Sequence, residues 1–401
     1  MVSMLQKHDY IIIGGGIIGL TIAHALKREK PNCIILILEK ENDIAQHASG
    51  RNSGVLHAGF YYTADSLKAK FTVDGNKAMR EYCKRKNLAI NECGKLVVAQ
   101  NEKELEQLYE LERRGKRNGS TIRLIDEKEA RAIEPNVRTH QKALYSPNTA
   151  TVDPMQVCQA LKNDLLDRGV IFLFHTAYIG KSGGAVDTTK GKFSAKKIIN
   201  CAGLYADKIA HDFGFGKKYT MIPFKGLYLE YTKNKTDIKT NIYPVPNLNN
   251  PFLGVHFTKT VTGKIKIGPT ATPAYWRENY TGLSRFSLNE FTKILSLEAK
   301  LFLTNAFGFR DVALEESKKY NRAYFIELAS KLVQEIDKNG FGGFTKPGIR
   351  AQLFDTTAQK LVQDFVIEGD TESTHVLNAV SPAFTCAFPF SEYIVENHIT
   401  H

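Results

Sequence analysis

The hydrophobic and polar positions near the start of the chain predict alternating strands and helices. Residues 10–13 are apolar, residues 14–19 are rich in glycine, residues 20–27 show helical spacing, and residues 34–38 are apolar again. A strand, a glycine turn, a helix and a second strand in this order predict a parallel strand–helix–strand unit. We therefore expect an α/β domain with a parallel sheet.

The glycine turn has the spacing of a dinucleotide-binding motif. Gly14, Gly16 and Gly19 fill the pattern G-x-G-x-x-G, and Glu39 follows 20 residues after the last glycine. The first glycine permits a tight turn, the second lets the backbone approach a pyrophosphate, and the third lets helix and strand pack closely. The helix N-terminus directs N–H groups at the phosphates, and Glu39 can accept hydrogen bonds from ribose hydroxyls. The motif predicts a dinucleotide cofactor and leaves flavin and nicotinamide both open.

Later segments predict a second domain with an antiparallel sheet. Short apolar runs bounded by turn residues occupy residues 221–223, 227–231, 252–257 and 264–268. Runs of this length and spacing are typical of antiparallel strands. Two helices are expected after them, at 287–303 and 321–338.

Three further runs have the composition of ligand-binding segments. Residues 50–62 combine glycine and small polar residues with three aromatic residues at the end, which favours a buried loop wrapped around a ligand. Residues 198–207 begin as an apolar strand and pass through small residues into a helix, where backbone can again contact a cofactor. Near the C-terminus, Ser381 is expected to be the N-cap and Pro382 the first residue of the last helix.

Composition and charge allow several partners but favour none. The chain has 401 residues, of which 43% are hydrophobic, enough for two domains. Its formal net charge of +12 would suit nucleic acid, an anionic membrane surface or an anionic substrate. The basic run at 113–117 lacks the interleaved aromatic residues that single-stranded nucleic acid favours. We therefore predict a generally basic surface and no nucleic-acid partner.

The cysteines and the N-terminal segment indicate a reducing compartment. The six cysteines are scattered, without C-x-x-C or a histidine at metal spacing, so we predict free thiols and no metal site. Residues 1–9 are too short and polar for a signal peptide, and no apolar run approaches the roughly 20 residues of a membrane span. We expect a cytoplasmic protein, with peripheral contact at the inner face of a membrane left open.

Several runs, taken in order along nearly the whole chain, match a known group of enzymes. The broader match rests on the glycine turn and on Asn52–Gly59, Val152–Pro154, Asn200–Asp207, Gly348–Arg350 and Ser381–Pro382. A narrower match rests on His57–Tyr62, Ser66–Lys70, Cys93–Ala99, Pro223–Gly226, Ile242–Pro246, Pro251–Thr258 and Gly348–Gln352. The chain thus resembles the FAD-dependent oxidoreductases of the D-amino-acid oxidase superfamily. Within them it most resembles the L-2-hydroxyglutarate dehydrogenase/oxidase family.

The resemblance implies two interleaved domains. A Rossmann-like FAD-binding domain is expected from residues 1–85, 142–215 and 340–401. A substrate-binding α+β domain, built on an antiparallel sheet with helices, is expected from 86–141 and 216–339. Non-covalent FAD is implied rather than a nicotinamide.

The implied activity is that of a FAD-dependent 2-hydroxy acid oxidoreductase. It would oxidise L-2-hydroxyglutarate to 2-oxoglutarate by hydride transfer to flavin N5, with electrons passed to quinone or oxygen. The alternative is an enzyme of the same superfamily for another small acid, such as an amino acid or glycerol 3-phosphate. The electron acceptor and the oligomeric state are not determined by the sequence.

The residues expected at the FAD come from the glycine turn, the small-residue loops and the last helix. They are Gly14, Gly16, Ile17, Ile18, Gly19, Glu39, Lys40, Asn52, Ser53, Gly54, Val55, His57, Ala177, Cys201, Ala202, Gly203, Gly348, Ser381, Pro382, Ala383 and Phe384. Two departures from the family pattern bear on substrate choice. Lys225 stands where the family often has arginine, and Phe384 is larger than the usual residue, so we expect it to reshape the pocket under the flavin.

The implied chemistry needs a base for the hydroxyl proton and cations for the carboxylates. His57 and His256 are both candidate bases, since histidine titrates near neutral pH; the alternative for each is a structural histidine. Arg350 is expected on the α-carboxylate, with a surface salt bridge as its alternative. Lys225 is expected on the distal carboxylate, with a solvated lysine as its alternative.

Two further features complete the expected site. Tyr62 and Tyr243 are expected to line the substrate pocket, although packing is the commoner role for tyrosines in such positions. Amides at the start of the last helix, next to Ser381 and Pro382, are expected to stabilise negative charge at flavin N1–C2=O.

Overall fold

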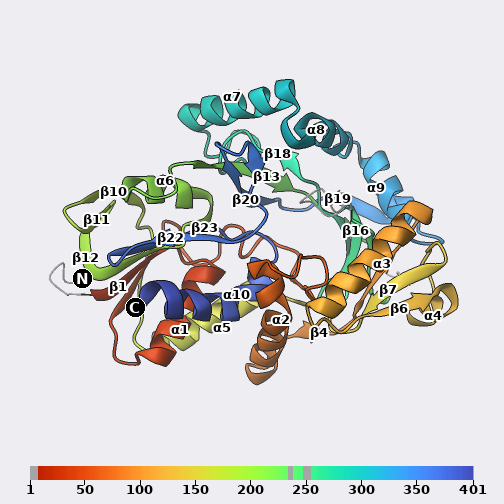
Figure 1. Ribbon diagram of the computed structural model, residues 1–401, viewed down its shortest axis with the longest axis horizontal. Helices are drawn as coiled ribbons and strands as arrows, with labels where there is room; N and C mark the ends of the chain where they lie inside the picture. Colours follow the sequence, from red (N-terminus) through yellow and green to blue (C-terminus); the bar gives the residue numbers. More distant parts are fainter. Residues whose placement is uncertain (1–7, 234–237, 247–253, 401) are drawn as a thin grey trace. The chain divides into compact units, whose positions relative to one another are not determined.

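The computed structural model describes residues 8–233, 238–246 and 254–400 (Figure 1). The chain divides into two compact units, each assembled from separate segments. Unit 1 comprises Met1–Arg51, Pro154–Ile222 and Arg350–His401, and unit 2 comprises Asn52–Asp153 and Pro223–Ile349. Residues 52–85 and 142–153, which the prediction placed in the FAD-binding domain, thus cluster with unit 2.

Unit 1 is built on an eight-stranded sheet. Its strands are β1 (His8–Ile13), β2 (Ile35–Leu38), β9 (Ile171–Leu173), β10 (Tyr178–Ser182), β11 (Ala185–Thr188), β12 (Gly191–Asn200), β22 (Val366–Gly369) and β23 (Ser373–Asn378). The order is β10-β11-β12-β1-β2-β9, with β23 beside β12 and β22 beside β23. β1 pairs in parallel with β2 and β12, β2 with β9, and β12 with β23. The predicted parallel α/β sheet is confirmed.

Helices cover this sheet because its central strands are apolar on both faces. They are α1 (Ile17–Glu29), α5 (Pro154–Asp167), α6 (Ala206–Asp212) and α10 (Ala383–Ile394), with short helical turns at Gly203–Tyr205 and Val395–Ile399. Ile11 and Ile12 of β1 have no exposed surface, as expected for a central parallel strand. α1 packs against both α5 and α10 (Figure 1).

Unit 2 is built on a second eight-stranded sheet, in the order β19-β14-β17-β16-β15-β5-β7-β6. These strands are β5 (Lys95–Val98), β6 (Arg123–Asp126), β7 (Lys142–Ser146), β14 (Leu229–Tyr231), β15 (Asn241–Pro244), β16 (His256–Lys259), β17 (Ile265–Gly268) and β19 (Phe341–Phe344). A small sheet is formed by β3 (Val55–Leu56), β8 (Ala150–Val152) and β4 (Ile90–Asn91). The antiparallel pairing predicted here is confirmed for β14–β17 and β15–β16–β17, whereas β15 pairs with β5 in parallel. Residues 252 and 253 of one predicted strand lie outside the described residues.

Two longer strands contain boundaries between the units. They are β13 (Tyr219–Gly226) and β20 (Gly348–Asp355). β13 pairs with β18 (Thr272–Pro273) in unit 2, and β20 pairs with β21 (Lys360–Leu361) in unit 1.

The helices of unit 2 are α2 (Leu67–Arg85), α3 (Glu102–Arg117), α4 (Glu127–Ile133), α7 (Leu288–Thr304), α8 (Phe309–Lys318) and α9 (Arg322–Ser330), with short turns at Ala306–Gly308 and Lys338–Gly340. Of the two helices predicted at 287–303 and 321–338, the first is confirmed as α7, and the helix α8 between them was not predicted. The helix expected at 321–338 is wrong beyond Ser330. The following residues pair with another segment instead: Gln334 N–H donates to the Asn136 carbonyl at 2.8 Å, and Val333 forms a bridge with Val137.

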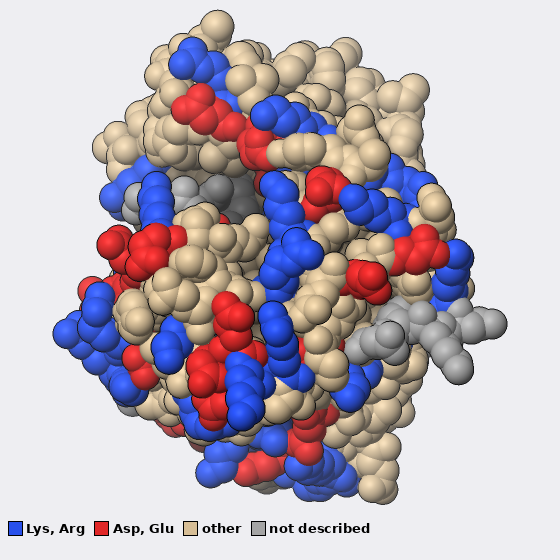
Figure 2. Space-filling model, turned by 90° about the vertical axis from the view of Figure 1, so that its right-hand side faces the viewer, with Lys and Arg blue, Asp and Glu red and all other residues tan. Residues whose placement is uncertain are grey.

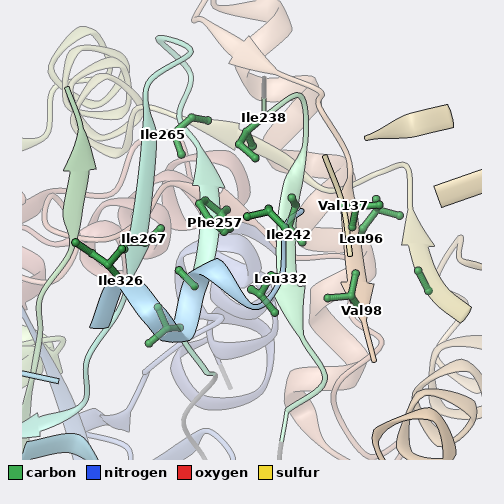
Figure 3. Close-up of a cluster of buried hydrophobic side chains, with 14 of the residues drawn as sticks. Leu96, Val98, Val137, Ile238, Ile242, Phe257, Ile265, Ile267, Ile326 and Leu332 are labelled. Carbon is green, nitrogen blue, oxygen red and sulfur yellow. The ribbon is translucent and has the colours of Figure 1, made fainter. Parts of the chain in front are cut away.

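One face of the unit 2 sheet carries a hydrophobic core (Figure 3). It includes Leu96 and Val98 of β5, Ile242 of β15, Phe257 of β16, Ile265 and Ile267 of β17, and Ile326 of α9. Successive side chains of a strand point to opposite faces. The intervening residues Val97 and Tyr243 therefore belong to a different buried cluster, with Phe60 and Tyr61.

The surface mixes both signs of charge. Figure 2 shows one face of the molecule, on which lysine and arginine side chains alternate with aspartate and glutamate. In the basic run of α3, Arg113 and Arg114 both pair with Glu110, and Lys116 pairs with Glu112. Across the described residues, none of the helices is both long and apolar enough to cross a membrane. The signal-peptide prediction rests on residues 1–9, of which 1–7 lie outside the described residues.

Candidate active site

The glycine turn of unit 1 takes the shape predicted for it. Gly14 has φ +111°, a conformation that favours glycine, and a Cβ there would lie 2.5 Å from the Cys201 carbonyl oxygen. A Cβ on Gly19 would collide with the Gly14 carbonyl oxygen, so α1 packs tightly on the end of β1. A Cβ on Gly16 would meet only the Ser49 hydroxyl within 4 Å. The space over Gly16 therefore allows a phosphate to approach the backbone.

The start of α1 offers amide groups and no acid. Gly16 is the N-cap, Ile17 N–H donates to Ser49 Oγ at 2.9 Å, and the first turn contains no acidic side chain. Ile18 and Gly19 follow in that first turn, where amides lack partners within the helix. This end of α1 can therefore receive an anion. Ser49 was not predicted from the sequence, because nothing in its own segment indicates that it caps a distant helix.

Glu39 is held by one backbone amide of the glycine turn and one of its own loop. It is buried, and its two carboxylate oxygens accept from Gly15 N–H at 2.8 Å and Glu41 N–H at 2.9 Å. Each carboxylate oxygen has a second lone pair for a ribose hydroxyl. The neighbouring Lys40 pairs with Glu41 at 2.6 Å, and its Nζ lies 5.4 Å from the Tyr205 ring centroid.

The end of β12 meets the glycine turn. Cys201 N–H donates to the Ile13 carbonyl at 2.9 Å, and the buried Asn200 accepts from Ala202 N–H at 3.2 Å. Gly203 has φ +54°, and a Cβ there would meet no atom within 4 Å. The structure thus brings Cys201 and Ala202 beside Gly14, as a shared cofactor segment requires. Ala177, also expected at the cofactor, is half-buried and donates its N–H to Thr189 Oγ1 at 3.1 Å.

The start of the last helix differs from the prediction. α10 begins at Ala383 with Pro382 as its N-cap and no side-chain cap, so the assignment of Ser381 as N-cap is wrong. The reason is a turn: Ala383 N–H donates to the Val380 carbonyl at 2.9 Å, so the serine is not needed as a cap. Phe384 is half-buried in the first turn.

The loop that contains His57 is buried and held in place by side chains from other segments. Asn76 Nδ2 donates to the Leu56 and His57 carbonyls at 3.1 Å, and Ser120 Oγ donates to the Ala58 carbonyl at 2.7 Å. The prediction of a buried loop is confirmed from Gly54 onward. Asn52, by contrast, is exposed, and its Oδ1 accepts from the Gly54 N–H at 2.8 Å.

The strand register of unit 2 places His256 beside Tyr243. Ile242 pairs with Phe257, so the next residue on one strand faces the previous residue on the other. The two rings stack with centroids 3.6 Å apart at 14°. His256 is buried, and its Nδ1 lies 2.8 Å from the Gly254 carbonyl, which can only accept. Nδ1 therefore carries the proton, and in the neutral ring Nε2 can accept one.

A buried lysine that the sequence did not predict as functional lies among these residues. Lys95, the first residue of β5, has no exposed surface. Its Nζ lies 5.0 Å from the ring of Phe60, 4.9 Å from Tyr61 and 4.5 Å from Tyr243. Burial lowers the pKa of the Lys95 ammonium to about 7. The only signal in the sequence is that a lysine begins an otherwise apolar strand.

His57 shares this environment. Burial lowers the pKa of the His57 imidazole well below its usual value, and the charges of Lys95 and His256 lower it further. His57 is therefore neutral near pH 7, the form that accepts a proton. Both candidate bases are buried in unit 2, and their catalytic role stays a prediction.

The remaining predicted substrate residues lie on separate elements: Lys225 and Arg350 on strands, and Tyr62 in the loop between β3 and α2. Lys225 on β13 is half-buried, donates to Asn279 Oδ1 at 3.2 Å, and has a pKa lowered by burial. Tyr62 is half-buried, with Lys68 Nζ 5.9 Å from its ring centroid. Arg350 is half-buried on β20 in unit 1, whereas Gly348 of the same strand falls in unit 2.

The family model described as FAD dependent oxidoreductase matches residues 9–396. This chain belongs to the FAD dependent oxidoreductase family. The oxidoreductase is 36% identical to the mitochondrial L-2-hydroxyglutarate dehydrogenase of Caenorhabditis briggsae, with 99% of this chain and 94% of the relative covered. It is 35% identical to the human mitochondrial enzyme of the same name, over 98% and 88% of the two chains. The family resemblance drawn from the sequence is confirmed.

Solved structures confirm the fold of this FAD dependent oxidoreductase. L-alpha-glycerophosphate oxidase from Mycoplasma pneumoniae, solved with FAD bound, superposes with a TM-score of 0.76 at 23% identity, covering 98% of this chain and 94% of that one. Glycine oxidase from Geobacillus kaustophilus gives a TM-score of 0.67 at 17% identity, over 98% and 94%. The prediction of FAD as cofactor agrees with the family. The open space over Gly16, the acid-free start of α1 and the buried Glu39 carboxylate suit that cofactor.

Proposed function

We propose that this chain oxidises L-2-hydroxyglutarate to 2-oxoglutarate with FAD. The observation that carries this proposal is the name shared by relatives that are 33–36% identical over nearly their full length, from Escherichia coli to nematodes and human. When bound, FAD supplies the acceptor for the hydride that leaves the substrate's C2. The chain's own residues must bind the two carboxylates and take the hydroxyl proton.

The proton acceptor is assigned to the histidines of unit 2. Both are buried, and His57 is neutral near pH 7 because burial and its neighbours lower its pKa. His256 has its Nδ1 proton directed at the Gly254 carbonyl, which leaves Nε2 able to accept a proton. A neutral imidazole near the substrate hydroxyl can contribute a factor of roughly 10²–10⁴ by general base catalysis.

Two cations are proposed for the carboxylates. Arg350 would bind the α-carboxylate through its planar guanidinium, which matches a carboxylate in two hydrogen bonds. Lys225 would bind the distal carboxylate. Its partial burial supports this role, because loss of solvent strengthens attraction to a carboxylate.

The cofactor is assigned mainly to unit 1. We propose that the amides of Ile18 and Gly19 receive the pyrophosphate, that Glu39 binds a ribose, and that the first turn of α10, from Ala383, faces the flavin. The family resemblance of the sequence also assigns the loop from Asn52 to His57 to FAD. The supporting observations are the space over Gly16 and the position of Cys201 beside Gly14.

Anaerobic mixing tests the reaction. Purified protein with bound FAD should lose its visible flavin absorbance on addition of L-2-hydroxyglutarate, and 2-oxoglutarate should form in equal amount. The D-enantiomer serves as the control. An unchanged spectrum with L-2-hydroxyglutarate, together with bleaching by an amino acid or glycerol 3-phosphate, would establish the alternative substrate class.

We further propose quinone or oxygen as the electron acceptor and a peripheral contact with an anionic membrane. The outer face of α7 supports the contact. Exposed leucines occur at Leu288, Leu295 and Leu303, and the exposed charged residues of this helix are Lys293 and Lys300. Both acids of α7, at 290 and 298, are buried. Leucines and lysines together on one helix face suit a surface of anionic lipid.

A further inference from the structure

Lys95 is a buried cation that its surroundings do not neutralise. Within the described residues, its Nζ has no hydrogen-bond partner, and burial is the sole cause of its lowered pKa, with no carboxylate contributing. Burying an ammonium without a partner is costly. The rings of Phe60, Tyr61 and Tyr243 offset only part of that cost, since a cation–π contact is weaker than the hydration that the ammonium loses. A methionine would fill the same space without this cost, so packing does not account for the lysine.

The position of Lys95 connects it to both candidate bases. The Tyr243 ring lies 4.5 Å from its Nζ and stacks on His256 with centroids 3.6 Å apart. Lys95 is also close enough to His57 for its charge to oppose protonation of that imidazole. The loop, β5, β15 and β16 thus bring one amine and two imidazoles into one buried cluster.

The other titratable groups around this cluster are uncharged at neutral pH. Burial raises the pKa of the Tyr61 and Tyr243 phenols, and it raises the pKa of the Cys93 thiol. Tyr62 and Tyr228 are the remaining groups that act on these phenols. Lys95 is therefore the cation that acts on His57 together with His256.

We propose that Lys95, whose buried amine lies beside the stacked Tyr243 and His256 rings, is a positioning residue for proton transfer. Its ammonium adds to the effect of burial in opposing protonation of His57, which is thereby left able to accept the substrate's hydroxyl proton. This inference rests on the proposed oxidation of a 2-hydroxy acid. In that step the substrate O–H bond breaks, an N–H bond forms on imidazole, and the C2–H electron pair leaves as hydride for the flavin. The carbon–oxygen bond becomes a carbonyl, so atoms and electrons balance.

The Lys95 ammonium is present in the pH range in which His57 would otherwise become protonated. A lysine with a lowered pKa is charged below that value and neutral above it. With a pKa of about 7, Lys95 is protonated under mildly acidic conditions, where a histidine with an ordinary pKa would also gain a proton. Repulsion between the two groups extends the neutral form of His57 to lower pH.

The test is the pH profile of kcat/KM, measured with L-2-hydroxyglutarate on the FAD-loaded enzyme. In Lys95→Met the acid limb should move upward by about one pH unit, because a like charge near the base has been removed. Lys95→Arg keeps the charge and should retain the wild-type limb. Lys27→Met is the matched control, because Lys27 is also buried but donates to the Pro31 carbonyl at the end of α1.

The outcomes separate the alternatives. A Lys95→Met enzyme that binds FAD and loses activity by the same factor at every pH would overturn the inference and leave Lys95 a structural residue. If Lys95→Met does not fold, Lys95→Arg decides the question. An upward shift of the acid limb of kcat/KM in that charge-retaining variant would overturn the inference equally. If wild-type flavin is reduced only by another acid, the proposed substrate fails, and the same comparison with that acid still decides the role of Lys95.

Discussion

At the residue scale, the two buried histidines differ in what surrounds them. His57 lies in a loop held by Asn76, and the nearby Lys95 ammonium opposes its protonation. His256 is stacked on Tyr243 and oriented by the Gly254 carbonyl. The first arrangement adjusts basicity, and the second fixes ring orientation. Loss of the His57 ring should therefore affect proton transfer, whereas loss of the His256 ring should affect substrate binding.

We expect His57→Asn to slow anaerobic flavin reduction by about 100-fold or more, the usual contribution of a general base. His256→Asn should have a smaller effect on that rate and a larger one on KM. Stopped-flow absorbance measures both, and the FAD content of each variant controls for folding. The reverse ranking would assign the proton transfer to His256, and less than tenfold slowing in both would remove histidine from this role.

Single residues also show where the sequence stops being informative. Gly14, Gly16 and Gly19 could be assigned because their roles depend on neighbours within one strand–turn–helix unit. Lys95 could not, since its environment is made by Tyr61, 34 residues earlier, and by β15 and β16, more than 140 residues later. When the strand register is not known, a lysine at the start of a strand is predicted to be a surface residue.

At the element scale, the β1–α1 unit allows a matched pair of glycine substitutions. Gly19→Ala puts a Cβ against the Gly14 carbonyl and should destabilise the apoprotein by roughly 1–3 kcal/mol. Gly16→Ala meets only a serine hydroxyl and should cost less than about 1 kcal/mol. It should nevertheless weaken FAD binding at least tenfold, because the methyl group occupies the phosphate approach.

Thermal unfolding of the apoproteins and FAD titration by flavin fluorescence measure the two effects separately. Equal FAD affinity in Gly16→Ala and wild type would show that the pyrophosphate does not contact this turn. A stable Gly19→Ala apoprotein would contradict the close packing of α1 on β1.

The pairing of β12 with β23 predicts a pH-dependent stability. His375 is fully buried, and burial lowers its pKa to about 4. Its Nδ1 lies 3.1 Å from the Asn200 side-chain amide, which donates, so a proton on Nδ1 would face another donor. Between pH 6.5 and about 4 the unfolded chain binds a proton that the folded chain does not. The free energy of unfolding therefore falls as pH is lowered through this window.

His375→Gln should remove this component. Over that window the wild type should lose up to about 3 kcal/mol more stability than the variant. Urea unfolding at a series of pH values measures this difference, and His140→Gln, at a histidine whose side chain is 39% exposed, is the control. Parallel pH profiles for wild type and His375→Gln would contradict the assignment.

The elements that sequence reasoning misjudged share one cause. Ser381 and Pro382 form a local capping signal, but the Val380 carbonyl takes the Ala383 amide. Residues 331–338 have helical spacing, but Gln334 pairs with Asn136. In both cases a hydrogen-bond partner that the local pattern does not reveal replaced the predicted one. Parallel strands and α1 were predictable because their apolar runs are continuous and their glycines are local.

At the scale of the whole molecule, α7 concentrates positive charge on one part of the surface, because its exposed charged side chains are both lysines. Burial raises the pKa of Glu298 to about 8, so this carboxyl is neutral at pH 7 and does not offset Lys293 and Lys300. The chain's net charge of +12 adds a long-range attraction to anionic surfaces. In the proposed membrane contact, the exposed leucines would supply apolar area for insertion among the lipids.

We expect the protein to sediment with vesicles that contain phosphatidylglycerol and not with neutral phosphatidylcholine vesicles, with binding weakened by salt because the attraction is screened. Leu288→Glu/Leu303→Glu should lose vesicle binding while retaining flavin reduction, since both leucines are exposed on α7. Ile179→Glu is the matched control: Ile179 is 66% exposed, close to the 65% of Leu288, but lies on β10 in unit 1. If the control also loses vesicle binding, the attraction depends on the net charge of the protein and not on α7. A sedimentation coefficient that falls on dilution for wild type but not for the double variant would instead show that a second copy of the chain covers this helix.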